Sequence, residues 1–345
     1  MERYIGIDAH RDSCTVTVLN ARGKKTQQHV LPTEGGALVE CVRSLTGSLH
    51  LCVEEGEWSE WLVEILSPWV GQVVVSQTPW RPGPKSDATD ARDLAERLRT
   101  GRLRTPIYKA PRQWARLREA VRLESKLTQD VVRTKQRLRS LYRRRGLTCS
   151  NDAIYAPRHR ADWIRKLPQS LVPSAEILGQ ELDVLVEFQQ TAERHMLTAA
   201  RKFPIRRILE TAPGIGPKRA ARLLAIVVTP HRFRSKRLFW SYCGLAVVTK
   251  TSSDWVAQAG GRWVRAPVIQ TRGLNRACNR QLKDLFKGAA NSALRGKPPN
   301  ALRDAYERML EAGTKPNLAR LTIARKIAAV VLAIWKSESE YRIMS

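Results

Sequence analysis

Residues 112–145 contain neither proline nor glycine, and this stretch limits the fold more than any other part of the chain. Pro111 and Gly146 bound it. A seam of alternating three- and four-residue steps is apolar at six of nine positions, which predicts a long amphipathic helix in a coiled coil or helical hairpin. The seam consists of Trp114, Leu117, Val121, Glu124, Thr128, Val131, Lys135, Leu138 and Tyr142.

A second helical pattern follows, and we expect this helix to pack back against the first. Its apolar side carries Leu178, Leu182, Leu185, Ala192 and Met196. The two helices define a basic helical region at 111–203, with an ordinary helical bundle and a solvated basic face as the alternative.

The first 110 residues alternate strand patterns with helix patterns, which is typical of an α/β domain. We expect helices at 35–45, 59–66 and 87–99, the last capped by Ser86. Strands are expected at 4–8, 15–20, 26–31, 51–54 and 73–76.

Charge is distributed unevenly along the chain. Residues 1–110 carry 14 basic and 14 acidic side chains, so the net charge of +28 lies entirely in residues 111–345. A basic surface of this size attracts a polyanion, and nucleic acid is the expected one. Arg133 and Arg137 of the long helix are candidate phosphate contacts.

Residues 204–345 are expected to form a mainly helical third domain. The sequence Pro213-Gly214-Ile215-Gly216-Pro217-Lys218 is similar to the hairpin of a helix-hairpin-helix DNA-binding element, because its glycines permit a tight turn before a helix N-terminus. Lys218, Arg219 and Arg222 are candidate nucleic-acid contacts beside it. Helices are expected at 274–290 and 317–336, whereas residues 246–272 show no clear pattern.

Four acidic residues fall where the predicted elements of the first domain begin or end. Asp8 and Glu54 end strands, and Asp87 and Asp90 lie three residues apart at a helix start. If the two strands are neighbours, four carboxylates converge at one end of the sheet. Such hard oxygen ligands favour Mg²⁺ or Mn²⁺, and a pair of these ions stabilises phosphoryl transfer. Glu55 is an alternative to Glu54, and no histidine shows metal-ligand spacing.

Several motifs together resemble the DEDD transposases, which are recombinases of insertion sequences. In the first domain the resemblance rests on Ile5-Gly6-Ile7-Asp8-Ala9-His10-Arg11, Val53-Glu54-Glu55-Gly56 and Lys85-Ser86-Asp87-Ala88-Thr89-Asp90-Ala91-Arg92. In the C-terminal region it rests on residues 213–216, 239–245, Ser252 and residues 273–280.

The resemblance implies a first domain of the RuvC type, which has an RNase H-like fold, with Asp8, Glu54, Asp87 and Asp90 as metal ligands. It further implies that a serine of the C-terminal domain links covalently to DNA. This serine corresponds to Ser252, with Ser253 as the neighbouring alternative. Donor and target DNA, a noncoding bridge RNA that selects them, and a homodimer or tetramer are the implied partners.

Two other functions compete with this interpretation. One is a metal-dependent nuclease that cuts DNA junctions by water attack, and the other is a non-enzymatic nucleic-acid scaffold. We expect a prokaryotic cytoplasmic protein, associated with the nucleoid during its reaction, since no secretory signal or membrane span is evident. The six cysteines are far apart, which indicates neither a disulfide framework nor a zinc site.

Overall fold

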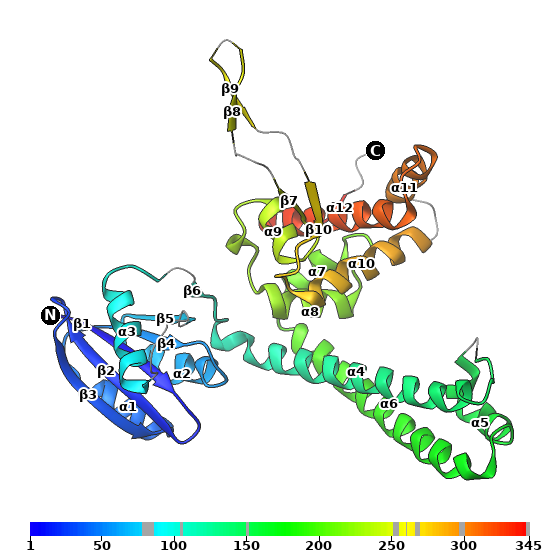
Figure 1. Cartoon of the computed structure of the whole chain (residues 1–345), viewed down its shortest axis with the longest axis horizontal. Helices are drawn as coiled ribbons and strands as arrows, with labels where there is room; N and C mark the ends of the chain where they lie inside the picture. Colours follow the sequence, from blue (N-terminus) through cyan, green and yellow to red (C-terminus); the bar gives the residue numbers. More distant parts are fainter. Residues whose placement is uncertain are drawn as a thin grey trace. The chain divides into compact units, whose positions relative to one another are not determined.

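The computed structural model describes residues 1–77, 86–103, 106–149, 152–250, 255–259, 261–265, 270–296 and 301–342. The chain divides into two compact units, Met1–Gln113 and Trp114–Ser345 (Figure 1). This division falls three residues after the predicted boundary at 110. The boundary predicted at 203 lies inside the second unit, so a separate domain from 204 stays a prediction.

The first unit contains a six-stranded mixed sheet in the order β3-β2-β1-β4-β5-β6. Strand β1 runs antiparallel to β2 and parallel to β4, which is parallel to β5. The strands are β1 (Glu2–Ala9), β2 (Ser13–Asn20), β3 (Lys25–Pro32), β4 (Ser48–Glu54), β5 (Gln72–Ser76) and β6 (Pro106–Ile107). The predicted α/β pattern is confirmed, with β6 as an additional short strand.

Helices cover both faces of this sheet. Ile5 and Ile7 belong to the buried core that includes Leu38 of α1 (Gly35–Arg43) and Leu62 of α2 (Ser59–Leu66). Because strand side chains alternate between faces, Gly6 and Asp8 point to the opposite face, where α3 (Asp87–Arg99) contacts β1.

The second unit begins with the predicted helical hairpin. Helix α4 (Ala115–Arg143) packs along α6 (Val172–Ala200), and the short α5 (Pro157–Ile164) contacts α6 (Figure 1). Most of the predicted seam is buried, but Thr134 is buried where Lys135 was expected. The reason is that Thr134 donates a hydrogen bond to Glu181 of α6 at 3.1 Å, whereas the ammonium of Lys135 lies 4.9 Å from the ring of Tyr155.

The rest of the second unit is mostly helical, as predicted. Its helices are α7 (Ile205–Glu210), α8 (Pro217–Val227), α9 (Lys236–Tyr242), α10 (Arg280–Arg295), α11 (Ala301–Glu311) and α12 (Pro316–Ser337). The predicted helix at 274–290 begins later, because Leu274 pairs with Val247 in a sheet and Asn279 caps α10. Short 3-10 helices lie at Ser67–Trp69, Arg112–Trp114, Asp152–Tyr155, Gln169–Leu171 and Pro230–Arg232.

Two small antiparallel sheets occupy part of the region without a clear sequence pattern. Strand β7 (Val247–Lys250) pairs with β10 (Gln270–Leu274), and β8 (Trp255–Ala257) pairs with β9 (Trp263–Arg265). These strands are only three to five residues long, which explains why no periodicity marks them in the sequence.

Candidate functional site

Asp8 is the central residue of the acidic group. It lies near the end of β1 and its side chain is only 2% exposed. Strands β1 and β4 are parallel with Ile7 opposite Val53, so Asp8 and Glu54 each lie one residue further along neighbouring strands. The two carboxylates therefore meet at the same edge of the sheet, as predicted from the strand order.

Gly6 brings the helix with the other two acids close to β1. A Cβ atom at this position would lie 1.9 Å from the carbonyl oxygen of Ala91 and 2.8 Å from the backbone nitrogen of Ala95, both in α3. Since only glycine permits this approach, α3 lies directly against the strand. Ser86 caps α3, which begins with Asp87 and carries the buried Asp90 one turn later.

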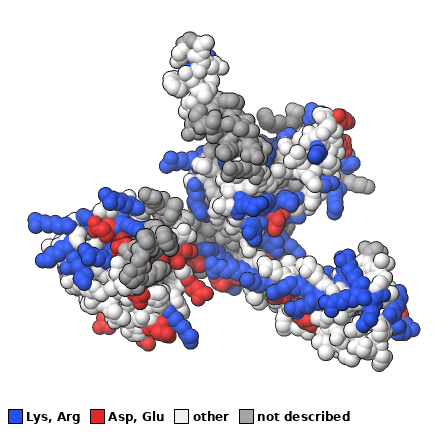
Figure 2. All heavy atoms as spheres, viewed as in Figure 1, with Lys and Arg blue, Asp and Glu red and all other residues white. Residues whose placement is uncertain are grey.

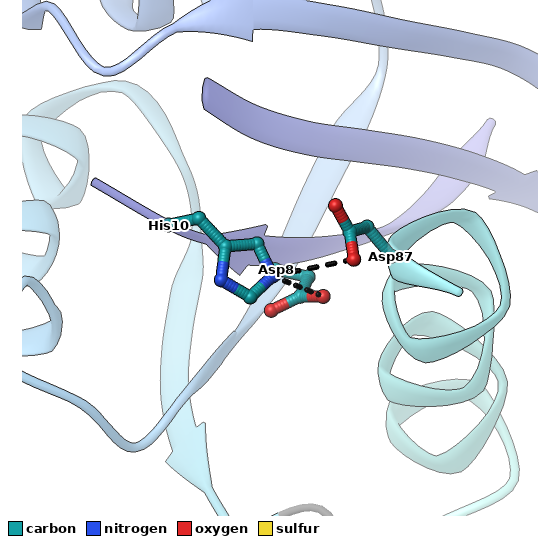
Figure 3. Close-up of side chains that lie close together, drawn as sticks. All are labelled: Asp8, His10 and Asp87. Atoms are coloured by element: carbon teal, nitrogen blue, oxygen red, sulfur yellow. Dashed lines mark ion pairs between the residues drawn. The ribbon is translucent and has the colours of Figure 1, made fainter. Parts of the chain in front are cut away.

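His10 joins the acidic group, although sequence reasoning did not select it. Its Nε2 atom lies 3.3 Å from Oδ2 of Asp8 and 3.3 Å from Oδ1 of Asp87 (Figure 3). The signal that points to it is the two-residue spacing from Asp8, which places both side chains on one side of an extended chain. Sequence reasoning assigned His10 no role because no histidine shows metal-ligand spacing, and the structure adds it as a candidate ligand.

The electrostatics at Asp8 favour a bound cation. Oδ1 of Asp8 is buried and has no hydrogen-bond partner among the described residues. Burial raises the pKa of Asp8 to about 6, with further increases from Glu54 and Asp87 and an opposing decrease from His10. A buried anionic oxygen without a donor is costly, and a divalent cation would remove that cost.

The described ligand atoms form a compact set. One atom each from Asp8, His10 and Asp87 lies within 4.8 Å of the others. Two carboxylates and an imidazole fit Mn²⁺ or Mg²⁺ through their oxygens, with the nitrogen better suited to Mn²⁺. The structure does not bring Glu54 or Asp90 into this set of described ligand atoms.

Glu54 and Glu55 have different surroundings. Glu55 forms an ion pair with Nζ of Lys109 at 3.0 Å, and the same ammonium donates to Oγ of Ser59 at 2.9 Å. Glu54 instead lies close enough to Asp8 to raise the pKa of Asp8. This difference favours Glu54 as the residue of the site.

The candidate nucleophile lies outside the residues that the structure describes. This holds for Ser252 and for its neighbour Ser253, as it does for Lys85 of the acidic motif. The described chain ends at Lys250 of β7 and resumes at Trp255 of β8.

Three of the predicted nucleic-acid contacts are paired with acids on the helical hairpin. Arg133 pairs with Asp130, Arg137 lies 3.7 Å from Glu181, and Lys218 pairs with Glu193. All three remain more than half exposed, so their pairing does not prevent contact with phosphate. Among the charged side chains that Figure 2 shows on the visible face of this hairpin, Lys and Arg predominate, whereas the first unit shows both signs.

Arg219 and Arg222 have structural contacts that the sequence did not indicate. Arg222 binds both oxygens of Glu124, which is 1% exposed, at 2.6 and 2.9 Å. Arg219 donates to the carbonyl of Gly214 at 2.8 Å and to Oγ of Ser292 at 3.1 Å. These contacts link α8 with α4 and α10, and the expected role of both arginines in phosphate binding stays a prediction.

Part of the predicted hairpin turn packs against α10. Gly214 has a φ of +71°, and a Cβ atom there would lie 2.2 Å from the carbonyl oxygen of Ala289 in α10. Ile215 of the same turn is buried. The glycine therefore permits close packing of the turn against α10, which the comparison with a DNA-binding hairpin did not anticipate.

Two family models match segments of the chain. Residues 5–144 match the family model of IS110-type DEDD transposases, and residues 206–307 match a model described as "Transposase IS116/IS110/IS902 family". The first of these matches covers the segment that forms the mixed sheet and places it in a DEDD-type transposase class. The chain is a member of the IS110 family of transposases.

One curated relative is similar to part of the chain. It is the "Insertion element IS110 uncharacterized 43.6 kDa protein" of Streptomyces coelicolor, 28% identical over 171 residues. The match covers 50% of this chain but only 38% of the relative. Separately, among the described helices none has the length and hydropathy needed to cross a membrane.

Replacement of His10 tests whether it is a metal ligand. We expect His10→Asn to weaken Mn²⁺ binding by about 10-fold or more, because one ligand nitrogen is lost beside two carboxylates. Calorimetric titration of the full chain with MnCl₂ measures this change. His29→Asn is the control, since His29 lies on β3 and contacts Gln27. Equal Mn²⁺ affinity in the two variants would show that His10 is only an ion-pair partner of the carboxylates.

Proposed function

We propose that this protein cuts and exchanges DNA strands as the transposase of an insertion sequence. The observation that carries the proposal is the buried oxygen of Asp8, which lacks a donor among the described residues and lies beside Glu54, Asp87 and His10. Two features support an RNase H-like domain: the central β1 is flanked by the antiparallel β2 and the parallel β4, and α3 lies on the face that carries Asp8.

Asp8, Glu54, Asp87 and Asp90 are the proposed ligands of Mg²⁺ or Mn²⁺, with His10 as a further candidate ligand. When bound, the cation would stabilise negative charge that develops on the phosphoryl group. The protein's own contribution is to hold the ligands in place: β1 and β4 fix Asp8 and Glu54, while Ser86 and Gly6 fix the start of α3.

The proposed nucleophile is the hydroxyl of Ser252, with Ser253 as the alternative. In this step the serine oxygen bonds to phosphorus, the phosphodiester bond to the adjacent nucleotide breaks, and the serine proton passes to a base or solvent. The strand end that leaves carries a hydroxyl group. Support for this step comes from the transposase family rather than from geometry.

A noncoding bridge RNA and a second copy of the chain are the proposed partners. The excess of basic charge in residues 111–345 supports binding of both DNA and RNA. Ile177, Val184 and Phe188 of α6 are 48–65% exposed at helical spacing, which supports association into a dimer or tetramer.

The proposed function is tested by trapping the reaction on labelled DNA. Native protein with Mn²⁺ is expected to yield a protein–DNA adduct that survives denaturation, whereas Ser252→Ala or excess chelator yields none. If peptide mapping places the adduct on Ser253, the nucleophile is Ser253 instead of Ser252. Metal-dependent cleavage without an adduct, undiminished in Ser252→Ala and Ser253→Ala, would identify a nuclease that uses water.

A further inference from the structure

A groove of about 860 Å³ lies between α10 and α12, at the base of the sheet formed by β7 and β10. Val247 of β7 and Gly273 and Leu274 of β10 line its strand side. We call it the α10–α12 groove. All of its lining residues belong to the second unit.

Four cationic side chains line the α10–α12 groove, and no acidic side chain does so among the described residues. Lys283 and Lys287 lie one turn apart on α10, and Arg320 and Arg325 lie on α12. Within the part of the chain that the structure describes, none of the four forms an ion pair. They differ in this respect from Arg133 and Lys218, whose charges are offset by acids of the hairpin.

Arg325 has a fixed position in the wall of the groove. Its Nε atom donates to the carbonyl of Leu245 at 2.7 Å, and its own carbonyl accepts from Nε1 of Trp240 at 3.0 Å, so the residue is held in place. Nη2, however, is buried without a hydrogen-bond partner among the described residues. An unsatisfied charged donor in a protein interior is costly unless a ligand accepts from it.

Two neutral amides and the hydroxyl of Thr322 complete the polar lining. Asn291 of α10 and Asn317 of α12 both line the groove, and Oδ1 of Asn317 accepts from Arg320 at 3.3 Å. Lysine, arginine and asparagine donors without acids are the set that binds phosphate oxygens of nucleic acid. The chemistry thus indicates a phosphodiester ligand rather than a carboxylate peptide or a cation.

We propose that the α10–α12 groove binds the phosphodiester backbone of a DNA strand during the reaction. DNA is favoured over RNA because β7, which lines the groove, ends two residues before the proposed nucleophile Ser252 in the sequence. A DNA strand bound at the base of β7 and β10 would contact residues that are close in the sequence to the proposed nucleophile. The inference deepens the proposed function and rests on it for the choice of DNA.

The test compares two double variants that remove the same charge from the same helices. Lys287→Gln with Arg320→Gln removes two cations from the groove. Arg295→Gln with Lys326→Gln is the matched control, because both residues are exposed on α10 and α12 and do not line the groove. Binding of the full chain to a labelled DNA duplex and to a labelled RNA hairpin is measured by fluorescence anisotropy across a salt series, with chelator present to prevent cleavage.

Each lost phosphate contact lowers the slope of log affinity against log salt by about 0.9. The groove variant is therefore expected to lower the slope for DNA by about 1.8 and to weaken binding by roughly 30-fold at 0.15 M salt. The control variant is expected to change affinity less than about 2-fold, because its side chains contact no phosphate in the groove.

Three results would overturn the groove proposal: equal losses of DNA affinity in the two variants, no loss in either variant, or a loss of affinity confined to RNA. In each case, DNA binding by the native protein would still support the proposed function. A selective loss of DNA binding by the groove variant, in a protein whose native form yields neither adduct nor cleavage, would support the groove and contradict the proposed function. The two proposals thus fail on different measurements.

Discussion

Asp8→Asn is expected to abolish DNA strand transfer while it stabilises the metal-free protein. The loss of activity follows because Asp8 is the proposed buried ligand, which lies between Glu54 and Asp87. Loss of a group that stabilises transition-state charge costs at least about 100-fold in rate. The gain in stability follows because asparagine carries no charge into the interior, so the two effects have opposite signs.

The pH dependence of stability provides a second test of Asp8. The pKa of Asp8 is about 6 in the folded protein, above the ordinary 3.8. The folded state therefore binds the proton more tightly than the unfolded state, and stability from this group is lost as pH rises from about 4 through 6. Metal-free native protein is expected to lose roughly 1–3 kcal/mol over this range, and Asp8→Asn is expected to lose less.

Urea unfolding of the metal-free protein at pH 5 and pH 7.5 measures both effects. Asp12→Asn is the control, because this substitution removes the same formal charge. Asp12 lies four residues further along the chain and its side chain is 92% exposed. A destabilised Asp8→Asn protein, or one that retains native strand transfer, would show that Asp8 is a structural acid instead of a metal ligand.

Gly6→Ala is expected to unfold the first unit or to displace α3 from the sheet. The added methyl group would overlap the Ala91 carbonyl at 1.9 Å, and backbone of a packed helix cannot move aside cheaply. Overpacking in a core costs typically 1–3 kcal/mol, and a backbone clash this short is expected to exceed about 3 kcal/mol. Since α3 carries Asp87 and Asp90, metal binding should be lost together with stability.

Gly36→Ala is the matched control for this prediction. Gly36 lies in α1, and a Cβ atom added there would have no heavy atom within 4 Å outside its own helix turn and chain neighbours, so alanine fits. Alanine in a helix is expected to leave stability unchanged or raise it by up to about 1 kcal/mol. Equal free energies of unfolding for Gly6→Ala and Gly36→Ala would mean that α3 does not depend on close contact with β1.

The parts of the site that depend on local pattern were predictable from sequence. Strand and helix periodicity predicted the elements around Asp8, Glu54 and Asp87, and parallel neighbouring strands explain why the first two carboxylates meet. The sequence named Glu54 with Glu55 as the alternative, and it could not show the ion pair of Glu55, because its partner Lys109 comes from a segment more than 50 residues later.

Contacts between distant segments account for the remaining differences. Arg222 appeared as a surface cation in the sequence, yet its partner Glu124 lies 98 residues earlier. Arg219 likewise donates to Ser292, 73 residues away. The spacing of His10 from Asp8 places the two side chains on one side of the chain, but its contact with Asp87 depends on where α3 lies, which the sequence pattern does not reveal.

Anomalous X-ray scattering from crystals of the protein grown with Mn²⁺ tests the metal site most directly. We predict an anomalous peak at the carboxylates of Asp8 and Asp87, and we predict that the peak is absent from crystals of Asp8→Asn. Mn²⁺ bound only elsewhere on the protein, or an undiminished peak at this position in Asp8→Asn, would contradict the proposal that these residues form the catalytic metal centre.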